Sequence, residues 1–254
     1  MRTTLLLAGL MTVSATSIAG NTCTASSGAT VPAVVELYTS EGCDSCPPAD
    51  RWLGTLKELA AGGRVLPLAF HIDYWDYIGW KDPFADPAFG VRQRVRASEA
   101  GAKVVYTPQV LYDNREFQDW RRTTATKLSL QPPKPARAEL RVNVANDGQA
   151  LKLDVAGSLK AGTRAASAYV ALYENELASD VKAGENRGVT LHHDFVVRRW
   201  LGPFAFNGSA IELSQSIAPV KGMKLDRSGI AVIASDDKGS VIQAVALSLR
   251  DCAG

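Results

Sequence analysis

The chain has 254 residues, of which 46% are hydrophobic and 21% are charged. This is ordinary globular composition, and the length allows one or two domains. The formal net charge of +2 provides neither the strongly basic surface that nucleic acid requires nor a strong preference for acidic partners, so we expect no nucleic-acid binding.

The N-terminus has the pattern of a secretory signal peptide. Arg2 precedes an apolar run over residues 5–13, and Ser17-Ile18-Ala19 forms a small-residue cleavage site. The run is short for a transmembrane helix and is interrupted by polar residues, which predicts no membrane span. Residues 1–19 are therefore predicted to be a signal peptide that is removed on export to the periplasm or the medium, and residues 20–30 a flexible leader.

A strand at about 33–39 is followed by a turn at Gly42 and a helix from Cys46 to about Ala60. Cys43 and Cys46 therefore have C-x-x-C spacing at the N-terminus of a helix that follows a strand. This context is typical of a redox-active cysteine pair, because helix-end amides stabilise a thiolate.

A second strand is predicted over residues 65–73, parallel to the first because a right-handed crossover joins the two. The C-terminal ends of parallel neighbours lie at the same edge of a sheet. His71 and Asp73 are accordingly expected to lie near Cys43.

Residues 74–84 form an aromatic-rich loop at that edge, with Trp75 as the best candidate for the border of a site. A helix is predicted over residues 87–99, with Arg92, Arg94 and Arg96 on its exposed face. Residues 104–112 are predicted to form a strand that contains a proline, and a cis Thr107–Pro108 bond beside the cysteines would explain it. The last helix of this region is predicted at about 118–129.

A proline-rich linker over residues 131–136 is the best domain boundary in the chain. After it, seven short strands without a clear helix predict an antiparallel β-sandwich of immunoglobulin-like architecture over residues 137–250. The predicted strands are 138–145, 150–156, 166–174, 189–199, 210–217, 229–235 and 241–249.

The segment before the linker, residues 31–130, resembles the thioredoxin fold, with strands and helices in the order β-α-β-α-β-β-α. The chain is most similar to the secreted bacterial family called domain of unknown function 1223. The stretches that carry this resemblance are 35–50, 71–76, 79–84, 106–109, 184–188 and 193–198. The resemblance implies an α/β thioredoxin-like domain and no particular reaction.

The leading hypothesis is thiol–disulfide exchange with other exported proteins and no organic cofactor. Cys43 would attack and Cys46 would resolve the mixed disulfide. The supporting residues would be Asp73 as a proton acceptor, His71 beside the pair, Pro108 and the Thr107 backbone in the substrate groove, and Trp75 at its edge. Asp44 disfavours a thiolate, which predicts a less oxidising pair than an electropositive motif would give.

Two alternatives stay open at this point. The disulfide could be structural, in a non-catalytic binding protein built on a thioredoxin scaffold. Reduced Cys43 and Cys46 could instead bind copper or zinc together with His71.

Cys23 and Cys252, at opposite ends of the mature chain, could pair or stay free.

One further stretch in the second region has a specific pattern. Residues 184–188 and His193 lie in a predicted hairpin whose polar residues would link the two regions. His192 and His193 are adjacent on a strand, so their side chains point to opposite faces and cannot readily share one metal ion.

Overall fold

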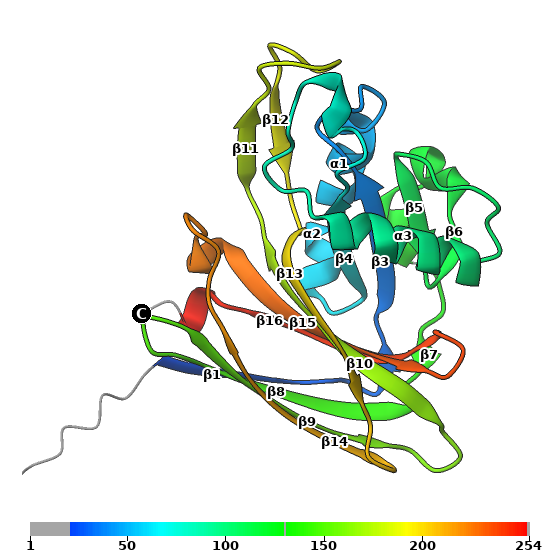
Figure 1. Cartoon of the computed structure of the whole chain (residues 1–254). Coiled ribbons are helices and arrows are strands. Elements are labelled where there is room, and N and C mark those ends of the chain that lie inside the picture. The colour runs from blue at the N-terminus through cyan, green and yellow to red at the C-terminus, as the bar shows by residue number, and fades with distance from the viewer. Residues whose placement is uncertain (1–20, 130, 253–254) are drawn as a thin grey trace, which may run out of the picture.

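An eight-stranded sheet extends through both regions of the computed structural model, which describes residues 21–129 and 131–252 (Figure 1). Its strand order is β16-β15-β10-β13-β4-β3-β5-β6, and a second large sheet has the order β1-β8-β9-β14. The protein is thus mixed α/β, with large sheets and few helices. The predicted signal peptide, residues 1–19, lies outside the described residues.

The first region is built around two buried parallel strands. Every residue of β3 and β4 is buried, as expected for central strands with both faces covered. The elements are β3 (Ala33–Thr39), α1 (Pro47–Gly54), α2 (Lys57–Ala61), β4 (Val65–His71), η1 (Asp76–Ile78), α3 (Pro87–Glu99), β5 (Gln109–Tyr112), β6 (Arg115–Glu116), η2 (Gln118–Arg122) and α4 (Ala125–Ser129).

Four predicted elements are shorter or divided in the structure, the first being the strand expected over 65–73, which ends at His71. The helix expected from Cys46 to Ala60 is divided into α1 and α2, because the Thr55 hydroxyl and amide both bond the Trp52 carbonyl and end α1. The strand expected over 104–112 begins only at Gln109, after a proline that has no amide hydrogen to donate. The helix expected over 118–129 is divided into η2 and α4.

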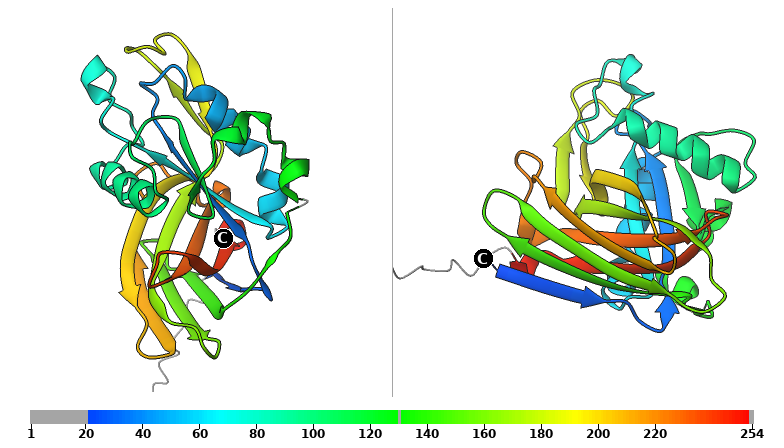
Figure 2. Two further views of the ribbon diagram at one scale, coloured as in Figure 1. Left: turned by 90° about the vertical axis from the view of Figure 1, so that its right-hand side faces the viewer. Right: turned by 60° about the horizontal axis from the view of Figure 1, so that its bottom comes forward.

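The second region contains two facing sheets, and most of the predicted strands correspond to observed ones. The strand expected over 189–199 is instead divided near Phe195, where φ is +58°, into two strands that belong to different sheets. The elements are β7 (Lys134–Pro135), β8 (Ala138–Asn146), β9 (Leu151–Leu159), β10 (Ala165–Glu174), β11 (Leu177–Asp180), β12 (Thr190–His193), β13 (Val196–Ala205), β14 (Ala210–Ile217), η3 (Leu225–Arg227), β15 (Ser228–Asp236), β16 (Val241–Ser248) and η4 (Arg250–Cys252). Alternate residues of β8 and β9 point into an apolar core that they share with β10, β15 and β16. Figure 2 shows the two sheets lying one over the other.

The residues expected to form a flexible leader are instead part of the folded protein. β1 (Asn21–Ser26) pairs antiparallel with β8, and β2 (Thr30–Val31) pairs with β7 inside the predicted linker. Cys23, in β1, is disulfide-bonded to Cys252, so the two terminal cysteines pair. Strand pairing and this bond fix a Gly/Ser/Thr-rich segment that composition alone describes as flexible.

The predicted linker at 131–136 separates two stretches of sequence, yet the sheet is continuous across them. The Ala69 amide in β4 donates to the Phe195 carbonyl at 2.8 Å, and β13 runs parallel to β4 beside it. One apolar core also joins Phe70 of the first region to Val197 and Ile233 of the second. In the described part of the chain, no helix is long and apolar enough to cross a membrane.

Candidate functional site

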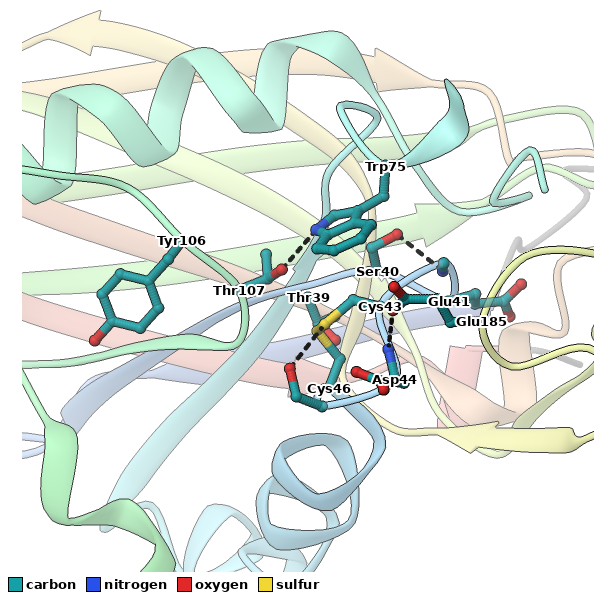
Figure 3. Close-up of a disulfide and its surroundings, with 12 residues drawn as sticks. Thr39, Ser40, Glu41, Cys43, Asp44, Cys46, Trp75, Tyr106, Thr107 and Glu185 are labelled. Atoms are coloured by element: carbon teal, nitrogen blue, oxygen red, sulfur yellow. Dashed lines mark hydrogen bonds between the residues drawn. A yellow bond between two sulfur atoms is a disulfide. The ribbon is translucent and has the colours of Figure 1, made fainter. Parts of the chain in front are cut away.

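The C-x-x-C pair lies where β3 turns into α1 (Figure 3). Cys43 and Cys46 are joined to each other as a disulfide and are 1% and 0% exposed. The Cys46 carbonyl accepts the amides of Ala49 and Asp50 at 2.8 and 3.2 Å, which starts the helix. Ser45 Oγ lies 3.3 Å from Cys43 Sγ on the outer side. The expected strand–turn–helix placement of the pair is therefore observed.

The predicted wall of the site lies beside the disulfide. Trp75 Nε1 donates to Thr107 Oγ1 at 2.7 Å, and Figure 3 shows both side chains next to Cys43. The Thr107–Pro108 bond is cis, as expected. Gly42 allows the close approach of the loop, because a Cβ there would be 3.1 Å from the Trp75 Cβ.

The β11–β12 hairpin covers the disulfide loop from the other side (Figure 1). Asn186 Nδ2 donates to the carbonyls of Glu41 and Cys43 at 2.8 and 2.9 Å. The Asp44 amide donates to Glu185 Oε2 at 3.0 Å. These bonds confirm that the polar residues of this hairpin link the two regions of the chain.

Five titratable side chains form a buried cluster behind this loop. His193 Nε2 lies 3.1 Å from Glu41 Oε1, and His71 Nδ1 lies 2.8 Å from Asp82 Oδ2. Asp50 Oδ1 is 3.7 Å from His193 Nδ1, which is close enough for an ion pair and too far for a hydrogen bond. None of the five residues is more than 6% exposed.

The charges in this cluster are strongly coupled. Burial alone would lower the pKa of His193, but the carboxylates of Asp50 and Glu41 outweigh burial and raise this pKa to about 10. Burial would raise the pKa of Asp82, and the neighbouring His71, together with the amides of Glu41 and Phe84, lowers it instead. A proton on His193 and a carboxylate on Asp82 are therefore the stable forms at neutral pH.

Not all of the predicted residues reach the cysteines. Asp73 is partly exposed and lies against α3, with its Oδ1 3.6 Å from where a Cβ on Gly90 would be. Among the described residues, neither cysteine forms a hydrogen bond with Asp73. The metal set of Cys43, Cys46 and His71 requires two thiolates, whereas the two sulfurs are joined as a disulfide in this structure.

Sequence reasoning missed four of the five residues of this cluster, namely Glu41, Asp50, Asp82 and His193, and it also missed Asn186 as a partner of the disulfide loop. One signal was available: Asp50 follows Cys46 by four residues, which is about one helical turn. The ligand atoms of Asp50, His71 and His193 all lie within 4.8 Å of one another, so these three residues could hold a metal ion. The arrangement thus offers a dithiol–disulfide pair and, separately, a nitrogen–oxygen cluster.

Two solved structures match most of the chain. It is 27% identical to protein AGR_C_4864 from Agrobacterium tumefaciens, whose crystal structure matches with a TM-score of 0.60 over 86% of this chain and 94% of that one. HBP35 of Porphyromonas gingivalis is 14% identical and matches with a TM-score of 0.63 over 87% of this chain and 76% of that one, a likeness of fold alone. No curated protein matches the sequence.

The family assignment rests on a match that covers most of the chain. Residues 34–234 match a described sequence family, and this range contains the disulfide loop, the aromatic loop and the hairpin that covers them. The chain belongs to the family described as protein of unknown function (DUF1223).

Proposed function

We propose that this protein is exported after loss of residues 1–19 and exchanges disulfides with other exported proteins through Cys43 and Cys46. The observation that carries the proposal is a disulfide at the start of α1, shortly after a central strand and beside Trp75 and Thr107. Residues 31–130 would form a thioredoxin-like unit and residues 137–250 an immunoglobulin-like sandwich. A second disulfide, Cys23–Cys252, supports an oxidising compartment.

The chemistry requires two exchange steps. In the reducing direction, the Cys43 thiolate attacks one sulfur of a substrate disulfide, and the other substrate sulfur leaves as a thiolate. The Cys46 thiolate then attacks Cys43 Sγ, releases the second substrate thiolate and forms the intramolecular disulfide. Two electrons pass to the substrate, and another dithiol must reduce the pair before the next cycle.

The surroundings support a peptide-like substrate. Trp75 and Thr107 form one side of the site, and the Thr107 backbone can pair with an extended segment. The Cys43 carbonyl is already bonded to Asn186. A substrate would therefore approach from the side of Trp75 and Thr107, opposite the hairpin.

The test is the reduction potential of the pair together with an exchange assay. We expect catalysed reduction of a model protein disulfide by the dithiol form, loss of this activity in Cys43→Ser, and trapped mixed disulfides in Cys46→Ser. A Cys23→Ser, Cys252→Ser double variant is the matched control and keeps the activity. A reduction potential below about −300 mV for the pair, together with no exchange activity, would refute the proposal.

One observation favours a second candidate, a binding protein with a structural disulfide. Both cysteines are almost completely buried, and Asn186 and Glu185 hold the loop that carries them. A reactive cysteine is ordinarily partly accessible. The same potential measurement separates the candidates, since a structural disulfide has the low potential and no exchange activity.

A further inference from the structure

Each imidazole in the buried cluster has one nitrogen that is hydrogen-bonded to a carboxylate and one nitrogen without a hydrogen bond. Among the described residues, His71 Nε2 and His193 Nδ1 have no hydrogen-bond partner. The two histidines are 0% and 2% exposed, so water in bulk does not satisfy these atoms. A buried polar atom without a partner is costly and calls for a ligand.

We propose that Asp50, His71 and His193 bind a divalent transition-metal ion of the zinc class. The three ligand atoms lie within 4.8 Å of one another. To form metal–ligand bonds of 2.0 to 2.2 Å, the three atoms would have to approach one another by roughly 1 Å, which side-chain rotation allows. The two imidazole rings meet edge to face, with centroids 4.8 Å apart.

The surrounding residues resemble the outer shell of a metal site. Histidine ligands of metals ordinarily donate their second ring nitrogen to a carboxylate, which fixes the ring and increases its basicity. Asp82 is the carboxylate that accepts from His71, and Glu41 is the one that accepts from His193. Thr39 Oγ1 donates to Asp50 Oδ2 at 2.9 Å, which leaves Oδ1 for the ion.

The charge of the cluster also favours a cation. Glu41, Asp50 and Asp82 are all buried, and no lysine or arginine among the described residues forms an ion pair with any of them. A metal ligand must be a neutral imidazole, so the ion would replace the proton that His193 otherwise holds, and its two charges offset the three carboxylates further than one proton does. Two imidazoles and one carboxylate suit zinc rather than calcium or magnesium, which prefer oxygen ligands alone.

The site is shielded but accessible from one direction. Phe84 packs edge to face against both imidazoles, with ring centroids 5.3 and 5.7 Å from those of His71 and His193. A cavity of about 350 Å³ between α1 and β12 is lined by Asp50 and His193 and gives an ion a path to the cluster. The three ligands come from α1, β4 and β12, so a bound ion would tie the hairpin to the first region.

This inference does not depend on thiol exchange, because neither cysteine is a ligand. The test begins with purified protein stripped by a chelator, exposed to excess Zn²⁺ and desalted. We expect one tightly held Zn²⁺ per chain by mass spectrometry of the metal, and the same stoichiometry in a Cys43→Ser, Cys46→Ser double variant. With Cu²⁺ as a probe, the wild-type spectrum should show electron spin coupling to two imidazole nitrogens.

The matched pair of variants uses the two adjacent histidines. His193→Gln should lose the ion, whereas His192→Gln, on the exposed face of the same strand, should keep it. Asp82→Asn should weaken Zn²⁺ binding roughly 10- to 100-fold through the outer shell. The proposal would be overturned if the two histidine variants bound Zn²⁺ equally, or if binding were lost only when the cysteines are replaced. A Cu²⁺ spectrum without nitrogen coupling would also overturn it. The Cu²⁺ spectrum uses wild-type protein, so it decides even where a variant fails to fold.

Discussion

Glu36 lies in a buried ion-pair network where the two regions of the chain meet, and its replacement by Gln should destabilise the whole protein. Arg92 Nη2 lies 2.7 Å and Arg96 Nε 3.5 Å from Glu36 Oε1, while the Tyr38 hydroxyl donates to Oε2 at 2.6 Å. The guanidinium of Arg92 stacks over Trp200 of β13, 3.8 Å from its ring centre. The network corrects the expectation of an exposed face for Arg92 and Arg96, whereas Arg94 is exposed as predicted.

Glu36→Gln changes little in volume but removes the charge that both arginines face. The new amide also places a donor group beside Arg92, which itself can only donate. Removing one partner of a buried ion pair ordinarily costs 3–5 kcal/mol. Arg96 keeps Glu99 as a second partner, so we expect a loss near the lower end, about 3 kcal/mol.

The same network predicts a pH dependence. Burial would raise the pKa of Glu36, but Arg92 and Arg96 outweigh burial and lower it below the ordinary 4.5. A carboxyl with a lowered pKa in the folded state contributes stability that is complete above its unfolded pKa and is lost as the pH falls through the folded pKa. The difference between wild type and Glu36→Gln should therefore be full at pH 7 and shrink below about pH 4.5.

Urea unfolding followed by circular dichroism measures both effects. Glu99→Gln is the matched control, because its side chain is 35% exposed and pairs with the same Arg96. A surface pair of this kind contributes about 1 kcal/mol or less. Equal losses in the two variants at pH 7, or a difference that persists unchanged at pH 3, would refute the reasoning about Glu36.

Two further predictions concern the site. Asn186→Ala removes the side-chain donor to the Glu41 and Cys43 carbonyls, of which the second keeps the Cys46 amide at 3.3 Å. We expect a loss of about 1–3 kcal/mol in urea unfolding and faster reduction of the disulfide by a small dithiol. The control Glu185→Gln retains an acceptor for the Asp44 amide and should change neither quantity. Equal reduction rates would show that Asn186 does not restrain the loop. Trp75→Phe removes the hydrogen bond to Thr107, worth about 1 kcal/mol, and should slow exchange while the circular dichroism spectrum stays native. An unchanged exchange rate would exclude Trp75 from the substrate groove.

Local patterns in the sequence identified most of the strands and the position of the cysteine pair. The alternation of buried and exposed residues in β8 and β9 is readable because one face of that sheet packs on a core. The start of α3 is likewise written locally, with Asp86 capping the helix just before Pro87. The position of the disulfide loop is likewise predicted by a short apolar strand, Gly42 and a helix start in the sequence.

The relation between distant segments could not be read in this way. β13 joins β4 through a single registered pair, Val196 with Ala69, and no local pattern specifies that partner. His193 and Glu41 are 152 residues apart in sequence. Each is a polar residue that sequence reasoning treats as exposed, and it becomes a buried partner only because the other supplies the matching charge.

The electrostatic surroundings of the disulfide, in addition to Asp44, affect the direction of the proposed thiol–disulfide exchange. Glu185 accepts the Asp44 amide, and Glu41 and Asp50 are buried behind the same loop, with one imidazolium, His193, to balance them. Carboxylates near a cysteine disfavour its thiolate, because like charges repel more strongly where water is excluded. A strong oxidant of the C-x-x-C type depends on the opposite, a stabilised thiolate in the reduced state. The negative surroundings therefore favour a pair that donates electrons to its substrates over one that accepts them.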